Sequence, residues 1–133
     1  MQDPQMFDQL QENDILFIDS GHCVRTGSDV NFLILDVLPR LSPGVVVHFH
    51  DIGLPDEYPK VYFTNPDFRV FWTEAYLLQA FLAFNQDFEV LLAVSYLMKN
   101  HRAEFCVAFP HIDTDEYRIS GSFWLRRLPK PIM

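Results

Sequence analysis

The sequence has few glycines and no glycine-rich turn. Five glycines occur in 133 residues, and none of them belongs to a Gly-x-Gly arrangement. Nucleotide-binding turns depend on such glycines, because a backbone without Cβ atoms can approach a phosphate closely. We therefore expect no P-loop and no dinucleotide-binding turn within this chain.

Positive charge is scarce as well. Ten Lys and Arg residues stand against 18 Asp and Glu residues, which gives a formal net charge of -8. Nucleic acids and anionic membrane surfaces are bound by clustered basic side chains, so we expect neither as a partner. No apolar run has the length of a membrane span, and the acidic, polar N-terminus is unlike a signal peptide.

Cysteine occurs only at Cys23 and Cys106, without the Cys-x-x-Cys spacing of metal and redox sites. Two distant cysteines indicate reduced thiols in a cytoplasmic protein, although the sequence leaves one disulfide open. Apolar side chains, in contrast, are abundant: 49% of the residues are hydrophobic and 15% are aromatic. A chain of this length and composition is typical of a single packed domain, here residues 1–133.

Strands and helices are expected to alternate along the chain. Apolar runs within 14–19 and 45–49 predict strands that are buried on both faces. Residues 88–97 predict a third strand, and residues 119–127 predict a fourth strand with a bulge at Gly121. This order indicates an α/β fold with a mostly parallel sheet.

Two longer helices are predicted between these strands. Residues 28–41 carry apolar side chains at helical spacing, with Ser28 as the N-cap. Residues 71–84 are apolar almost all round, so we expect the second helix to be mostly buried. Residues 51–67 have the glycine and proline content of a long loop, and residues 98–118 match no element.

Four polar residues follow the first two predicted strands. Asp19 and His22 come after the first strand, and His50 and Asp51 end the second. Ligands bind at the carboxyl ends of strands in open parallel sheets, so we expect these side chains to converge. Carboxylates and imidazoles suit a divalent cation or general-base chemistry, and they also occur as ordinary polar strand ends. His48, deeper in the strand, is expected to be structural.

The letters HDIG at 50–53 resemble the metal-binding motif of HD-domain phosphohydrolases. That resemblance implies a metal-dependent phosphohydrolase using His50 and Asp51. In that family the pair belongs to an all-helical bundle, whereas the residues VVVHF before this pair favour a strand. The phosphohydrolase is therefore kept as an alternative.

A longer resemblance covers most of the chain. The segments DILFIDSGH (14–22) and LPRLSPGVVVHFHDI (38–52), followed by FEVLLAVSYL (88–97) and GSFWLRR (121–127), resemble strands four to seven of class I S-adenosylmethionine-dependent methyltransferases of the small-molecule O-methyltransferase type. This resemblance implies a partial Rossmann-like sheet flanked by helices, mostly parallel with an antiparallel last strand. It implies methyl transfer from S-adenosylmethionine to a small-molecule acceptor.

The resemblance also implies site residues. Asp19, His50 and Asp51 match the positions that bind a divalent metal in metal-dependent relatives, and His22 and His50 match positions suited to a catalytic base or acceptor contact. The glycine-rich cofactor half has no counterpart, so we expect the C-terminal portion of such a fold, weak or inactive alone. The open edge of strand 14–19 is then expected to be covered in a homo-oligomer, by a missing N-terminal half or by residues 1–13. A non-catalytic assembly or binding module is the other alternative.

Overall fold

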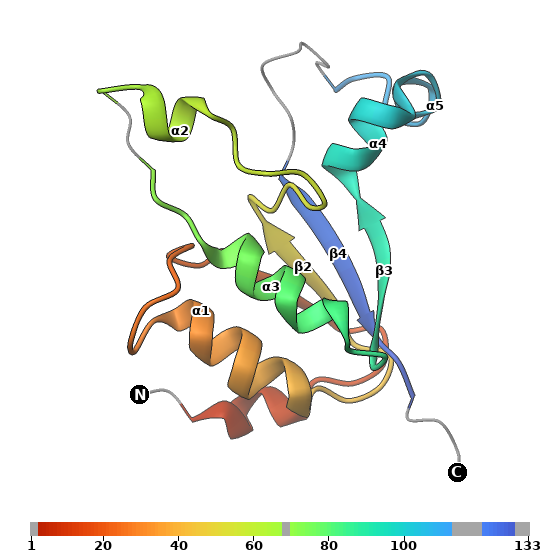
Figure 1. Ribbon diagram of the computed structural model, residues 1–133. Helices are drawn as coiled ribbons and strands as arrows, with labels where there is room; N and C mark the ends of the chain where they lie inside the picture. The colour runs from red at the N-terminus through yellow and green to blue at the C-terminus, as the bar shows by residue number, and fades with distance from the viewer. Residues whose placement is uncertain (1–2, 68–69, 113–120, 130–133) are drawn as a thin grey trace.

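A computed structural model describes residues 3–67, 70–112 and 121–129, which contain one four-stranded sheet. Its strands are β1 (Ile15–Ile18), β2 (Val46–His50), β3 (Phe88–Ala93) and β4 (Ser122–Arg127), in the order β1-β2-β4-β3 (Figure 1). The β1 and β2 strands are parallel, and β4 runs antiparallel to both of its neighbours, β2 and β3. The expected mixed α/β sheet is therefore present, with the last strand antiparallel and the first two adjacent.

The first connection crosses from β1 to β2 as a continuous but irregular helix. It comprises α1 (Asp29–Asn31), the π-helical η2 (Phe32–Val37) and the 3-10 turn η3 (Leu38–Arg40). The Ser28 hydroxyl accepts the N–H of Asn31, as expected for its N-cap. The 3-10 helix η1 (Pro4–Gln9) packs on η2 through Phe7 and Phe32, and it does not join the sheet.

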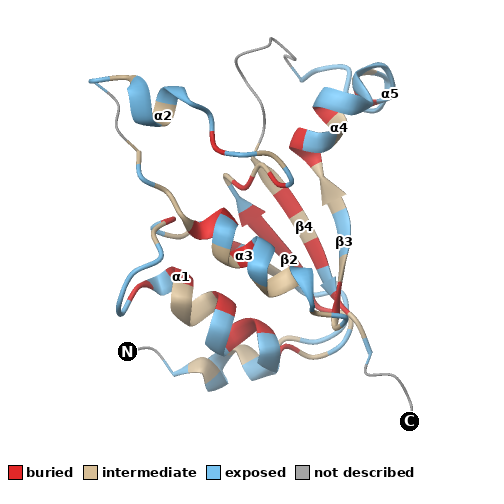
Figure 2. Ribbon diagram, viewed as in Figure 1, coloured by how far each residue is buried: buried red, intermediate tan, exposed pale blue. Residues whose placement is uncertain are grey.

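The hydrophobic core lies on one face of the sheet. Val47, Phe49 and Leu125 are completely buried beneath the α1–η2 segment and α3 (Glu74–Ala83), as Figure 2 shows for the strands and helices. Side chains alternate along a strand, so the intervening residues point to the other face. There Ile15 and Phe17 are 58% and 59% exposed, although both are large and apolar.

Two predicted elements are only partly right. Helix α3 begins at Glu74, and only Glu74, Ala75 and Leu78 are buried, whereas Phe84 just after its end is 97% exposed. The expectation of a mostly buried helix was therefore wrong. The predicted strand at 88–97 ends at Ala93, because the chain continues as helix α4 (Val94–Asn100). A short apolar run does not distinguish a strand from a buried helix turn.

Two further helices lie in segments predicted as a loop or left without a prediction. These are α2 (Val61–Thr64) in the long loop and α5 (Arg102–Ala108), which follows α4 beyond the carboxyl end of β3 (Figure 1). The predicted bulge at Gly121 is wrong, since the register shift lies between Val90 and Leu92 of β3. Residues 119 and 120 of the predicted strand lie outside the described residues.

Within the described ranges, no helix is both long and apolar enough to cross a membrane. Cys23 and Cys106, which both lie in those ranges, are not joined by a disulfide.

Tyr58 attaches the long loop after β2 to the start of α3. Its ring is buried, and its hydroxyl accepts the backbone N–H of Ala75 at 3.0 Å. Burial raises the pKa of Tyr58 to about 12, because the phenolate would lose its hydration. The contribution of Tyr58 to stability is therefore fully present below pH 10, its ordinary pKa, and is lost as the pH rises through 12.

Replacing Tyr58 by Phe leaves the buried N–H of Ala75 without its acceptor. We expect a loss of about 1–3 kcal/mol in the free energy of unfolding near neutral pH. Because Phe does not titrate, the difference from wild type should narrow by about 2 kcal/mol between pH 10 and pH 12. Urea unfolding between pH 10 and pH 12 measures the difference in free energy of unfolding. Tyr96→Phe is the control, because Tyr96 is partly exposed. A constant difference would contradict the assigned pKa.

Candidate functional site

The loop after β1 is shaped by short-range polar contacts. The Asp29 carboxylate at the start of α1 accepts the N–H of Gly21 at 2.7 Å, and the Ser20 hydroxyl accepts the N–H of His22 at 3.0 Å. A Cβ atom on Gly21 would lie 3.2 Å from an Asp29 oxygen, so glycine fits this close approach. His22 itself has a φ of 55°, an uncommon conformation for a residue with a side chain.

The turn after β2 has a similar feature. Asp51 has a φ of 59°, and the next residue, Ile52, donates its N–H to the Gly121 carbonyl just before β4. A Cβ atom on Gly121 would lie 2.5 Å from the Cα of Asp51. Glycine at position 121 therefore permits the close packing that turns Asp51 toward the end of β1.

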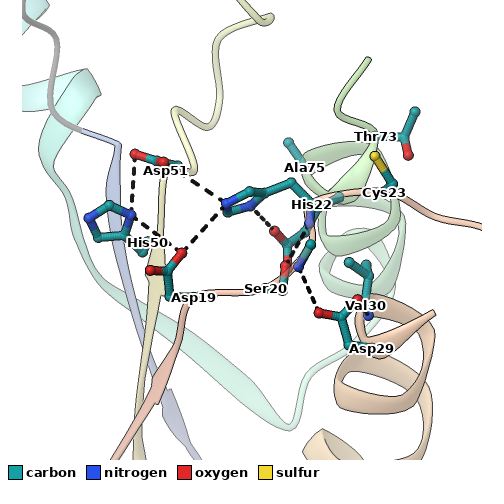
Figure 3. Close-up of polar contacts among 12 residues, drawn as sticks. Asp19, Ser20, His22, Cys23, Asp29, Val30, His50, Asp51, Thr73 and Ala75 are labelled. Carbon is teal, nitrogen blue, oxygen red and sulfur yellow. Dashed lines mark hydrogen bonds and ion pairs between the residues drawn. The ribbon is translucent and has the colours of Figure 1, made fainter. Parts of the chain in front are cut away.

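These two turns bring together all four residues singled out from the sequence. His22 Nε2 lies 3.6 Å from Asp19 Oδ1 and 3.9 Å from Asp51 Oδ2 (Figure 3). His50 Nδ1 lies 3.8 Å from Asp19 Oδ1 and 3.3 Å from Asp51 Oδ1. His22 is buried, whereas the side chains of Asp19, His50 and Asp51 are partly open to solvent. The site thus places a sheltered imidazole beside two accessible carboxylates.

Glu74 is a member of this group that sequence reasoning missed. Its carboxylate lies 2.7 Å from His22 Nδ1, and the residue is completely buried. Desolvation raises the pKa of Glu74, and the hydrogen bond with His22 opposes that rise. The only sequence signal is an acidic residue in the first turn of a helix, which is a common and unspecific feature.

Aromatic rings enclose the group on the side of α3. The Trp72 ring lies against the His22 ring at a centroid distance of 4.3 Å, and Tyr62 meets Trp72 edge-on at 5.4 Å. Desolvation raises the pKa of Tyr62, and the nearby negative charge of Asp51 adds to the rise. On the α3 side the site is thus bounded by aromatic rings, and the Trp72 ring packs against the imidazole of His22.

A cavity of about 80 Å³ opens beside Asp51. Its lining includes the acidic residues Asp51, Asp56 and Glu57, together with Tyr58 and Tyr62. One ammonium group also lines it, that of Lys99 on α4, which forms a 2.9 Å ion pair with Asp56. The cavity is large enough for a small chemical group, and its lining carries more negative than positive charge.

The predicted metal ligands Asp19, His50 and Asp51 lie near one another at the ends of β1 and β2. Within residues 3–67, 70–112 and 121–129, no three His, Cys, Asp or Glu side chains are arranged to hold a metal ion. His50 Nδ1 lies 3.8 Å from Asp19 Oδ1 and 3.3 Å from Asp51 Oδ1. A metal-binding role for these three residues stays a prediction, and the roles assigned to the side chains below do not depend on a cation.

His48 has a packed environment on the open face of the sheet. Its ring stacks on Phe17 at 4.8 Å and lies 4.4 Å from the Trp124 ring. Its Nε2 lies 2.9 Å from the Ser122 hydroxyl, and burial lowers the pKa of His48, with a smaller contribution from His50. These contacts agree with the structural role expected for His48.

The chain is thus a mixed α/β domain with an open sheet, and its titratable side chains lie at the carboxyl ends of the two parallel strands, where ligands bind in many folds of this class. Residues 2–52 match a family model described as a methyltransferase domain. The match supports a methyltransferase-like domain and includes Asp19, His22, His50 and Asp51. No curated protein and no solved structure matches the chain.

The close contact of Gly121 with Asp51 leads to a test of the second turn. We expect Gly121→Ala to lower the free energy of unfolding by about 1–3 kcal/mol, because the new methyl group overlaps backbone atoms of Asp51. Gly53→Ala is the matched control, since its Cβ would meet only Ser95 Oγ at an ordinary 3.5 Å. Urea unfolding of both variants measures the difference, and equal stabilities would show that the turn relaxes without strain.

Proposed function

We propose that this chain supplies the acceptor side of an S-adenosylmethionine-dependent methyltransferase that acts on a small molecule. The observation that carries the proposal is the convergence of His22 with Asp19 and Asp51 at adjacent strand ends, inside the segment that matches a methyltransferase domain. In this assignment β1, β2, β3 and β4 correspond to strands four, five, six and seven of the Rossmann-like methyltransferase sheet.

The proposed roles follow from the position of each side chain. His22 Nε2, sheltered and directed toward two carboxylates, accepts the proton of the acceptor's nucleophile. His50, half-exposed at the end of β2, contacts the acceptor from the solvent side. Asp51 joins this group to the neighbouring cavity, which has room for a small part of the acceptor and whose acidic lining disfavours anionic acceptors.

The described residues do not fit the cofactor by themselves. S-adenosylmethionine supplies an electrophilic methyl group when bound, and class I enzymes hold it with a glycine-rich turn that this chain lacks. We therefore assign the chain no cofactor-binding residue. This chain alone is expected to be a weak or inactive methyltransferase. The proposal therefore concerns only the part of the site that binds the acceptor.

We propose a further contact with another polypeptide segment at the edge of β1 that faces away from β2. Within the described residues β1 pairs only with β2, and the segment 3–13 forms no strand beside it. An apolar edge strand with unpaired backbone groups is prone to pair with another strand. We propose that a second copy of the chain or the rest of the methyltransferase fold covers it.

The alternatives have less support. Residues 46–50 form a strand in the middle of the sheet order, unlike the helical setting of the phosphohydrolase motif that HDIG resembles. A non-catalytic assembly module would not need the buried His22–Glu74 contact, since an apolar pair would hold the same elements together without burying charge.

Transfer of labelled methyl groups from S-adenosylmethionine to small hydroxylated acceptors tests the proposal. The assay uses the natural gene product with whatever sequence adjoins these residues, with and without Mg²⁺. We expect His22→Ala to reduce the rate by about 100-fold or more, because the proton acceptor is removed. Calorimetric titration of residues 1–133 alone with S-adenosylmethionine should show weak or no binding.

His101→Ala is the control for this test, since His101 lies between α4 and α5 and packs near Tyr96. Its rate should equal that of wild type. The methyltransferase proposal fails if no methyl transfer occurs. Hydrolysis of phosphodiesters that chelator and His50→Ala abolish would then favour the phosphohydrolase. Tight stoichiometric cofactor binding by residues 1–133 would contradict the assignment of the cofactor side to other residues.

A further inference from the structure

We propose that Glu74 is a positioning residue for His22, which it holds with Nδ1 protonated so that Nε2 is the proton-accepting atom at the site. The contact between these two side chains is geometric and independent of any ligand. Its catalytic consequence rests on the function proposed above.

The two nitrogens of His22 have different surroundings. Nδ1 lies 2.7 Å from Glu74 Oε2, the distance of a charge-assisted hydrogen bond. Nε2 lies 3.6 and 3.9 Å from the nearest oxygens of Asp19 and Asp51, beyond hydrogen-bonding distance. A carboxylate only accepts hydrogen bonds, so the proton of the neutral ring belongs on Nδ1, and the lone pair of Nε2 faces the accessible carboxylates.

The backbone fixes this orientation from both ends of the contact. The His22 carbonyl accepts the N–H groups of Thr73 at 2.8 Å and Glu74 at 3.1 Å, so the start of α3 is attached to the loop after β1. The Trp72 ring covers the imidazole face at 4.3 Å. Since the ring has little freedom to turn, Glu74 determines which nitrogen carries the proton.

Burial of the Glu74 carboxylate also lowers the stability of the fold, which an apolar contact at the same position would not do. The residue is 0% exposed, and its Oε1 atom has no hydrogen-bond partner among the described residues, although the Ser20 side chain, like His22, stabilises the carboxylate and opposes the rise of its pKa. A buried carboxylate with one unsatisfied oxygen is unfavourable relative to an apolar side chain of similar size. Local features that lower stability occur most often at functional sites. The buried carboxylate of Glu74 is such a feature, and it is explained if Glu74 determines which nitrogen of His22 carries the proton.

Two-bond ¹H–¹⁵N NMR spectra of the full chain test the proposal without any assay of activity. At about pH 9, where an ordinary imidazole is neutral, we expect the His22 signals to show protonated Nδ1 and unprotonated Nε2. Glu74→Gln removes the charge but keeps the shape, and its amide can donate as well as accept. This variant should therefore shift His22 toward the form protonated at Nε2.

Glu89→Gln is the matched control, because Glu89 pairs with Arg126 on a different part of the sheet. It should leave the His22 signals unchanged. Protonated Nε2 in the wild type would overturn the proposal, even if Glu74→Gln failed to fold. So would a folded Glu74→Gln variant with an unchanged His22 spectrum.

A kinetic measurement then separates positioning from acceptor binding. If the natural gene product transfers methyl groups, Glu74→Gln should lower kcat by at least about 10-fold and leave KM within about 3-fold. A change confined to KM would contradict the positioning role. If no methyl transfer is found, the proposed function fails while the NMR result still decides the role of Glu74.

Discussion

The docking of the loop after β1 onto the start of α3 is the interaction on which the site depends. The His22 carbonyl accepts two N–H groups at the helix start, where the helix lacks a capping side chain, and the Thr73 hydroxyl accepts the N–H of Val24 at 2.7 Å. Helix N–H groups that lack partners must be satisfied when they are buried. The loop supplies these partners, and the same contact brings Glu74 to His22, a residue 52 positions away in sequence.

A second constraint is the one-sided packing of the sheet. The crossover helices and α3 pack on the face that carries Val47 and Phe49, which leaves Ile15 and Phe17 of β1 on an open face. Parallel strands are ordinarily covered on both faces, and their apolar runs reflect this double burial. These exposed apolar side chains lie beside the edge of β1, which pairs only with β2 among the described residues, and such a surface is prone to pair with further polypeptide.

Asp19, His22, His50 and Asp51 could be singled out from the sequence because their positions depend on short segments. An apolar run that ends in polar residues marks the end of a strand locally, and adjacent parallel strands then bring those ends together. Glu74 gave no such signal, since its importance arises from a contact between distant segments. The end of β3 at Ala93 was missed for a related reason, because residues 94–97 are mostly apolar and fit either a strand or the start of α4.

The unfavourable features of the structure lie close to one another. Two of the three residues other than glycine with positive φ in the described ranges, His22 and Asp51, belong to the site, and the buried carboxylate of Glu74 adjoins them. Each of these features lowers the stability of the fold, and a conformational strain of this kind costs about 1–3 kcal/mol per residue. The surrounding contacts maintain these features. They include the close packing of Gly121 against Asp51 and the hydrogen bonds from the start of α3 to the His22 carbonyl. Their concentration around one imidazole is the arrangement expected if His22 has the role proposed for it, because local features that cost stability occur most often at functional sites.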